Sequence, residues 1–280
     1  MTVEATIART RREPLTRRMR WAVHDGLVLT RRNLLRYLRI PTLLVFSTIQ
    51  PVMFVLLFRY VFGGAITQLP PGAEAYVNFL MPGIFVQTAI FGSTQTGIGL
   101  AEDLNAGIID RFRSLPMSRS AVLAGRTTAD LFRNLFVVVL MTIVGYLAGF
   151  RFQQGLALGA LVIGGAVLIG FAFSWISATM GLAIKNLEAV QASSFIWIFP
   201  LTFASSAFVP TETMPGWLQA FANNNPVTIW VNTLRAFTIG DVYLHYLGET
   251  YLGLVLRSAL WIAGILAVFV PLSIRVYRRT

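Results

Sequence analysis

Few side chains in this 280-residue sequence could carry out acid–base, nucleophilic or metal chemistry. Cysteine is absent and the only imidazoles, His24 and His245, are far apart in the chain, so a Cys/His or multi-His metal site is not expected. The only lysine, Lys185, stands between Ile184 and Asn186, which excludes the Gly-Lys-Ser/Thr pattern of a P-loop. No G-x-S-x-G motif is present. We therefore expect no catalytic residue, metal or cofactor in this chain.

The composition is typical of a protein surrounded by lipid. Hydrophobic residues make up 55% of the chain and charged residues 12%, about half of the charged share of soluble domains. The formal net charge of +11 would suggest nucleic acid in a soluble protein. Here the arginines stand at the ends of apolar runs, so we assign them to membrane topology and expect no nucleic-acid partner.

Six apolar runs are long enough to cross a bilayer, which requires about 20 helical residues. Because backbone amides in lipid must be hydrogen-bonded internally, each run should be a helix. The runs are Pro41–Phe62, Phe79–Ala101, Leu131–Phe150, Leu156–Ile184, Ala189–Pro210 and Leu252–Ile274. The sequence therefore predicts an all-α integral membrane protein, with a six-span domain over 41–280 and an N-terminal segment over 1–40.

Arginines mark the orientation of these spans. Most of them lie before the first span, between spans two and three, and after span six, which the positive-inside rule places in the cytoplasm. Both termini are therefore expected to be cytoplasmic, and the protein to be multi-pass in the plasma membrane. Three in-span arginines, Arg59, Arg133 and Arg257, are near span ends and are expected to extend to the membrane surface.

The stretch Leu15–Arg39 has the periodicity of an amphipathic helix. Val23, Leu27, Leu34 and Leu38 share one side, and a basic helix of this kind should lie in the membrane interface. Its basic surface comprises Arg18, Arg31, Arg32, Arg36 and Arg39. The helix serves either as a passive anchor or as a surface that also contacts a partner protein.

A charged loop, Glu102–Asp130, follows the second span. Within it Asn105–Leu115 predicts a short helix ended by Pro116. Its apolar residues Ile108, Ile109, Phe112 and Leu115 recur at spacings of three and four. Such a helix is suited to a groove on another protein, and the alternative is an ordinary solvated loop.

The segment Thr211–Tyr251 is expected on the outer side. It contains two short helical stretches, PGWLQAFAN and PVTIWVNTLRAFT, the second opened by Asn225 and Pro226 and closed by Gly240. About 13 residues are too few to cross, so this segment should dip into the membrane or lie on it, as an outer gate or as a packed cap.

Polar residues inside spans two and five should face inward, because polar groups in lipid cost free energy. They serve either hydrogen bonds between helices or a substrate path. The candidate path residues are Gln87, Gln95, Phe195, Trp197, Phe199 and Phe203.

The stretch DRFRSLPMSRSAVLAGRTTADLFRN (Asp110–Asn134) resembles the signature loop of type-2 ABC exporter permeases, most closely the daunorubicin-resistance branch. The segments Phe208–Phe237 and Leu29–Gly64 are similar to that branch as well. The resemblance implies six spans, short re-entrant helices between spans five and six, and pairing with a second permease copy.

The resemblance also implies a coupling helix over Asn105–Met117 that contacts a cytoplasmic ABC ATPase, present in two copies. Its expected contact residues are Asp110, Arg111, Phe112, Arg113, Ser114, Leu115, Pro116 and Met117. ATP and Mg would bind the partner, and the transported substrate would be a hydrophobic drug, polyketide or lipid. Two rival classes remain open: a stand-alone channel, and a membrane-embedded lipid-modifying enzyme using Glu212, Asp241 and Glu249.

Overall fold

The computed structural model describes residues 15–64, 69–70, 76–114 and 119–279, and every regular element in that part of the chain is helical. In chain order these are α1 (Leu15–Arg39), α2 (Pro41–Leu56), the π-helical η2 (Leu57–Phe62), α3 (Tyr76–Asn105), α4 (Ile108–Ser114), α5 (Arg119–Leu147), α6 (Gly155–Ile184), α7 (Leu187–Phe203), the 3₁₀ turn η3 (Thr211–Thr213), α8 (Gly216–Asn224), α9 (Pro226–Ile239), α10 (Asp241–Leu247) and α11 (Tyr251–Arg279).

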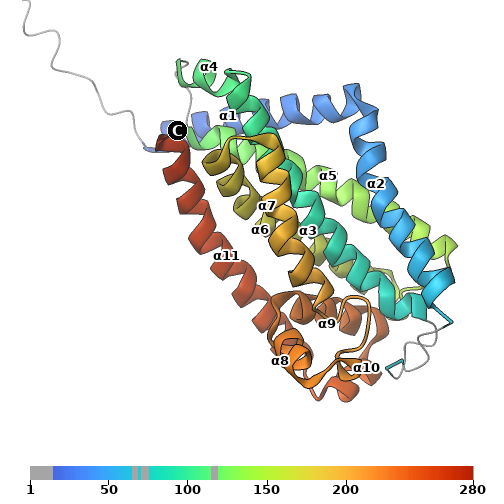
Figure 1. The fold of residues 1–280 in the computed structure, drawn as a ribbon. Coiled ribbons are helices and arrows are strands. Elements are labelled where there is room, and N and C mark those ends of the chain that lie inside the picture. Colours follow the sequence, from blue (N-terminus) through green and yellow to red (C-terminus); the bar gives the residue numbers. More distant parts are fainter. Residues whose placement is uncertain (1–14, 65–68, 71–75, 115–118, 280) are drawn as a thin grey trace, which may run out of the picture.

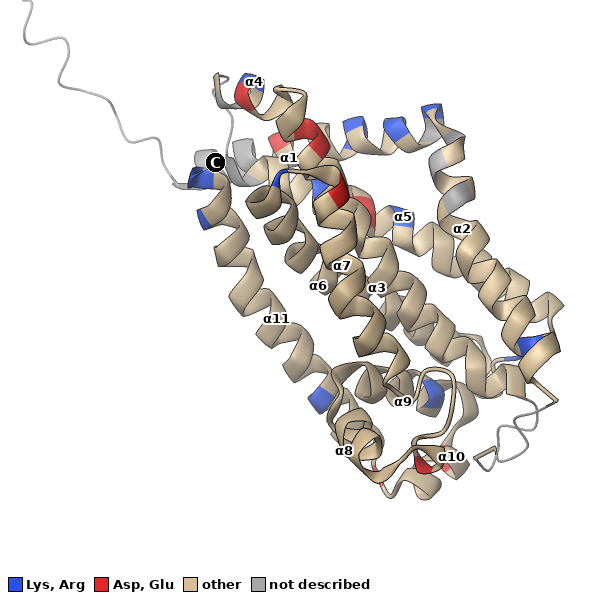
Figure 2. Cartoon of the chain, viewed as in Figure 1, with Lys and Arg blue, Asp and Glu red and all other residues tan. Residues whose placement is uncertain are grey.

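The long helices run side by side, and α1 lies across one end of them (Figure 1). The α4 helix and the C-terminal turn of α11 are at that same end, while α8–α10 close the opposite, distal end. We call the first the basic end because Lys and Arg lie along α1 and at the end of α11 (Figure 2). Pro41 occupies the first turn of α2, where it costs no hydrogen bond and allows the chain to turn sharply away from α1.

In the described part of the chain, four helices are long and apolar enough to cross a membrane: α3, α5 from Ala121 onward, α6 and α11. Two further apolar helices are shorter, Ser47–Phe62 and Leu187–Phe203. These helices make the chain a multi-pass membrane protein. The prediction of an all-helical membrane protein is thus confirmed, and four of the six predicted runs lie in helices of spanning length, with changed bounds: α3 extends past its predicted run at both ends, and α5 begins twelve residues before Leu131.

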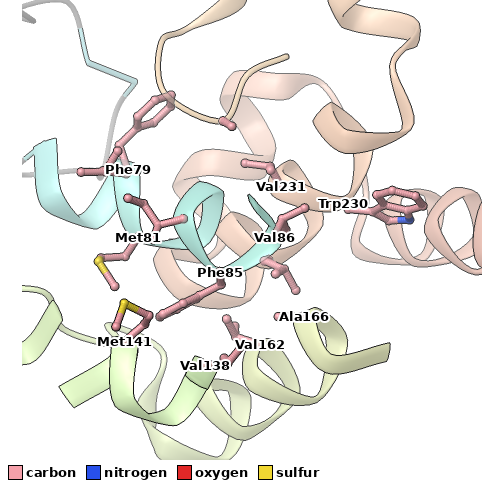
Figure 3. Close-up of a cluster of buried hydrophobic side chains, with 14 of the residues drawn as sticks. Phe79, Met81, Phe85, Val86, Val138, Met141, Val162, Ala166, Trp230 and Val231 are labelled. Atoms are coloured by element: carbon pink, nitrogen blue, oxygen red, sulfur yellow. The ribbon is translucent and has the colours of Figure 1, made fainter. Parts of the chain in front are cut away.

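The core is built around α3, whose first half is buried on all sides. Phe79, Met81 and Phe85 of α3 meet Met141 of α5 and Trp230 of α9 in one apolar cluster (Figure 3). A helix surrounded in this way by other helices cannot face lipid. It therefore presents its polar groups to the protein rather than to the membrane.

Helices α3 and α6 approach so closely that backbone meets backbone. A Cβ added at Gly97 would lie 2.4 Å from the carbonyl oxygen of Ser177, and one at Gly181 would lie 2.2 Å from that of Gly97. Small residues permit this approach between membrane helices. Of the α6 glycines, Gly159 and Gly165 also lie against side chains, whereas Gly164 faces open space.

The predicted fifth span ends early, because α7 stops at Phe203. The carbonyl groups that a helix end leaves unpaired are satisfied here by a side chain: the Asn225 amide donates to the oxygens of Leu201 at 2.7 Å and Ala204 at 2.9 Å. Asn225 also caps α9 by accepting from the amide of Val227. One residue thus ends one helix and begins another.

Both predicted short helices of the distal segment are confirmed as α8 and α9, and Gly240, with φ of 99°, closes α9. The structure adds α10, which the sequence analysis did not identify. Arg235 of α9 is completely buried despite its charge. The reason is that five hydrogen bonds, described below, compensate its removal from water.

Candidate functional site

The α4 helix projects from the basic end after a tight turn at Gly107, whose φ is +66°. Ile109 is buried and Phe112 half-buried, while Asp110, Arg111 and Ser114 are exposed. The predicted short helix with one apolar face is thus present over Ile108–Ser114. Leu115, Pro116, Met117 and the side chain of Arg113 lie outside the described residues.

Arg32 of α1 joins three helices at the base of α4. Its guanidinium pairs with Asp103 of α3 at 3.0 Å, and its central carbon lies 5.0 Å from the centre of the Phe112 ring. Arg36, one turn further along α1, pairs with Glu102 of α3 at 2.6 Å. A displacement of α4 would therefore act on α1 and α3 together.

The predicted orientation of α1 requires correction. Of the five arginines of the predicted basic surface, Arg32 and Arg36 bind acidic residues of the protein itself, and Arg31 and Arg39 are exposed. The side chain of Arg18 lies outside the described residues. Leu27, assigned to the packed side, is 63% exposed, whereas Leu29 is buried. The reason is that Gly125 of α5 gives Leu29 room: a Cβ at Gly125 would lie 2.6 Å from that of Leu29.

A buried carboxylate, Asp130 of α5, lies between this surface and the interior. The Tyr37 hydroxyl of α1 donates to one oxygen and the Thr96 hydroxyl of α3 to the other, both at 2.5 Å. Arg126 and Arg133 flank it, with Nε atoms 3.5 and 3.6 Å from its oxygens. We call Tyr37, Thr96, Arg126, Asp130 and Arg133 the Asp130 cluster.

The electrostatics of the Asp130 cluster leave one positive charge in excess, since two guanidinium groups face one carboxylate. Burial raises the pKa of the Tyr37 phenol and the negative charge of Asp130 raises it further, so this hydroxyl remains a donor. Each arginine also binds a carbonyl oxygen of α3: Arg126 that of Gln95 at 3.0 Å, and Arg133 that of Gly92 at 2.5 Å.

The expectation that Arg133 extends to the membrane surface was therefore wrong. Arg133 is 4% exposed, because a carboxylate and a carbonyl within the protein offer better partners than the lipid boundary. The sequence analysis also placed Asp130 at the end of a loop, whereas it lies within α5 and is completely buried. Of the other two arginines, Arg59 is half-buried and donates to the oxygen of Ala148, and Arg257 is exposed and pairs with Glu249.

A cavity of about 240 Å³ opens beside the Asp130 cluster, between α2, α3, α5 and α7. Three of the six predicted path residues line it: Gln87, Gln95 and Phe195. The sequence analysis missed several other lining residues, including Ser47, Gln50, Arg133, Asn134 and Gln191. Gln50 and Gln191 are amides inside or beside apolar runs, which is the signal that could have identified them.

The other three predicted path residues lie elsewhere. Trp197 stacks on Phe173 of α6 with ring centres 5.7 Å apart. Phe199 stacks on Phe203 at 4.1 Å, and Phe203 lies against Phe208 at 5.0 Å. Aromatic pairs of this kind are a stable way to fill apolar space, so these rings serve packing rather than the cavity.

At the distal end, Arg235 of α9 fastens the segment after α7 to α3. It donates to the carbonyl oxygens of Phe79 at 2.8 Å, Ser206 at 2.6 Å and Ala207 at 3.1 Å. It also donates to side-chain oxygens of Ser206 and Asn232. The central carbon of the guanidinium lies over the ring of Phe79, 3.4 Å from its centre, so the charge has an aromatic contact as well as its hydrogen bonds.

No group of three or more His, Cys, Asp or Glu suited to a metal occurs among the residues that the structure describes. Of the three acidic residues considered for a lipid-modifying enzyme, Glu249 is bonded to Arg257 at 2.6 Å.

Comparison with known proteins decides the family. Residues 25–239 match the model of the ABC-2 type transporter family. The chain belongs to this family. It is 35% identical over 249 residues to the daunorubicin resistance ABC transporter permease protein DrrB1 of Streptomyces coeruleorubidus, covering 88% of this chain and 83% of that protein.

Other relatives agree. The permease is 29% identical over 277 residues to the probable doxorubicin resistance ABC transporter permease protein DrrC of Mycobacterium tuberculosis, covering 99% of this chain and 96% of the relative. It is 26% identical over 214 residues to the putative transport permease ycf38 of Cyanophora paradoxa, covering 76% of this chain and 73% of that protein. The resemblance to drug-resistance ABC permeases is thus confirmed, and the chain is a membrane permease of the ABC exporter class.

Proposed function

We propose that this chain is the transmembrane subunit of an ATP-driven exporter, moves a hydrophobic drug, polyketide or lipid across the plasma membrane, and couples to a separate ATPase through α4. ATP and Mg bind the partner. The observation that carries the proposal is the contact of Arg32 with both Phe112 and Asp103. This contact connects the exposed helix α4 to α3, which lines the cavity. Closure of the ATPase can shift the helices only if it contacts α4 differently in its two states.

In this proposal the basic end is cytoplasmic and both termini lie on that side. The two shorter apolar helices, Ser47–Phe62 and Leu187–Phe203, complete six spans over 41–280, with 1–40 as the interface segment and α8–α10 as the outer gate or cap. A second permease copy would cover the apolar residues that α2 and α7 leave exposed, such as Met53, Phe195 and Phe199. Each of the two copies would bind its own ATPase.

The coupling test reverses a charge on the exposed face of α4. Arg111→Glu should abolish both ATP-dependent transport and co-purification of the ATPase, while the permease still inserts in the membrane. Phe112→Asp should do the same. Arg151→Glu at the distal end is the matched control, since Arg151 is also exposed, and it should leave both readouts unchanged. Full export by both α4 variants would refute the assignment.

Orientation has a separate test, because the chain contains no cysteine. A cysteine placed at Arg39 in α1 should react with a membrane-impermeant maleimide only from the cytoplasmic side. One placed at Trp217 in α8, which is 76% exposed, should react only from the outside. The opposite labelling pattern would contradict the proposed topology.

A further inference from the structure

Two unpartnered polar groups at the cavity wall point to the chemistry of its ligand. The Gln87 Nε2 and Thr88 Oγ1 atoms are buried and have no hydrogen-bond partner, and both residues line the cavity. The two residues are 4% and 6% exposed. Buried polar groups are normally paired, and one left unpaired is costly.

The unpaired hydroxyl of Thr88 distinguishes it from other hydroxyl residues of the long helices. Thr94 of α3, Thr142 of α5 and Thr179 of α6 each donate back to a carbonyl oxygen three or four residues earlier, which is the usual way for a helical hydroxyl to be satisfied. The Thr88 hydroxyl makes no such bond. Thr88 thus keeps an unpaired hydroxyl in a residue that lines the cavity, directly after Gln87.

The charge at the cavity wall has one sign. Among the lining residues that the structure describes, Arg133 is the only charged one. Its charge is only partly balanced, because Asp130 is shared with Arg126. A charge in a site of low polarity acts strongly on a ligand within a few ångströms, so the cavity favours anions and repels cations.

Part of the remaining wall is aromatic, beside the uncharged polar residues Ser47, Gln50, Thr94, Gln95 and Gln191. Phe54, Phe91 and Phe195 line it, and the rings of Phe91 and Phe195 meet edge to face with centres 5.7 Å apart. Flat apolar ligands bind such ring faces and edges well. The cavity thus combines aromatic rings with N–H and O–H donors and one cation.

We propose that the cavity selects amphiphiles that carry carbonyl or acidic oxygens and no positive charge, with Arg133 setting the charge preference and Gln87 and Thr88 donating to the ligand oxygens. This inference rests on the proposed function, since it names the ligand of the same cavity. The oxygen could belong to a small molecule or to an anionic lipid headgroup, and the experiment separates the two sources.

The test uses three pyrene probes that differ only in their end group: 1-pyrenebutyrate, 1-pyrenebutanol and 1-pyrenebutylamine. Binding to the full permease in phosphatidylcholine nanodiscs is followed by energy transfer from tryptophan to pyrene, with empty nanodiscs subtracted. The carboxylate should bind more tightly than the ammonium by on the order of tenfold, with the alcohol between them. Equal or tighter binding of the ammonium would overturn the inference.

Variants of the permease test which residues produce the preference for the carboxylate over the ammonium probe. Arg133→Gln should remove the difference between carboxylate and ammonium. Thr88→Val, which keeps the side-chain shape, and Gln87→Leu should weaken the carboxylate and the alcohol several-fold. Leu135→Ala, on the exposed side of the same helix as Arg133, is the control and should bind all three probes as the parent does. If Arg133→Gln does not fold, the order of the affinities of the three probes for the parent permease still tests the inference.

The source of the ligand is found by repeating the alcohol titration in phosphatidylglycerol nanodiscs. The alcohol is uncharged, so the lipid surface neither attracts nor repels it. A weaker affinity would identify the lipid headgroup as the occupant, and an unchanged affinity a small molecule; both outcomes uphold the oxygen preference. Absence of saturable binding by any probe would instead contradict the transport role of the cavity, whereas binding in the wrong order would contradict this inference alone.

Discussion

The Arg32 guanidinium lies over the ring of Phe112 while it pairs with Asp103, so that α1, α3 and α4 meet at one side chain. The pairing with Asp103 fixes the guanidinium, and Phe112 in turn positions α4 against it. An exposed helix of seven residues has little stability of its own. Its position therefore depends on contacts such as this one.

Loss of the Arg32–Phe112 contact should loosen α4. Phe112→Leu keeps an apolar side chain but removes the ring, and Arg32→Gln removes the charge. Each should increase amide hydrogen exchange within 108–114, and the two together should show a coupling of about 0.5–1 kcal/mol. Phe112→Tyr should behave as the parent, and so should Arg31→Gln, since Arg31 is exposed. Additive effects of the two changes would contradict the contact.

Removal of the Asp130 charge should destabilise the protein strongly. In Asp130→Asn the guanidinium groups of Arg126 and Arg133 remain buried and lose the carboxylate that lies between them, which is expected to cost about 3 kcal/mol or more. Tyr37→Phe removes only one hydrogen bond and should cost about 1 kcal/mol. Thermal unfolding followed by tryptophan fluorescence in detergent measures both. A smaller effect for Asp130→Asn than for Tyr37→Phe would show that the charge is not essential.

The contact between α3 and α6 should tolerate no added side chain. Gly97→Ala or Gly181→Ala would place a Cβ against a carbonyl oxygen of the facing helix, so the helices must separate and the melting temperature should fall by several degrees. Gly164→Ala on α6 is the control. It meets open space and gains helix propensity, so its melting temperature should stay the same or rise slightly.

The distal segment should depend on the shape of Arg235 as well as on its charge. Lysine cannot reach the oxygens of Phe79, Ser206 and Ala207 at the same time, because it lacks the planar fork of the guanidinium. Arg235→Lys should therefore expose residues 204–210 to proteolysis and lower the melting temperature. Arg257→Lys, at an exposed position, should change neither. Equal protease resistance of the two variants would argue against this role of Arg235.

Residues that begin and end helices made the distal helices predictable from the sequence. Asn225, Pro226 and Gly240 act within a few residues of their own positions, and the structure places the ends of α9 where they indicate. The ends of α7 and α5 were less predictable. The end of α7 depends on Asn225, more than twenty residues away. The first twelve residues of α5 include charged residues, so they were not part of the predicted apolar run.

The buried charges show more clearly which contacts can be predicted from the sequence and which cannot. Arg126, Asp130 and Arg133 follow one another at spacings of four and three, so their mutual pairing was readable from the helix period. Arg32 and Arg36 could not be assigned in that way, because Asp103 and Glu102 are about seventy residues away in the chain. Which polar residues share a cavity likewise depends on how four separate helices pack.

The most direct test of the account is ATP-dependent uptake of a fluorescent substrate into proteoliposomes that contain the permease with or without its ATPase subunit. The account predicts uptake only when the ATPase and ATP are both present, and none with Arg111→Glu in the reconstituted complex. Uptake against a gradient at the full rate by the permease alone would contradict it.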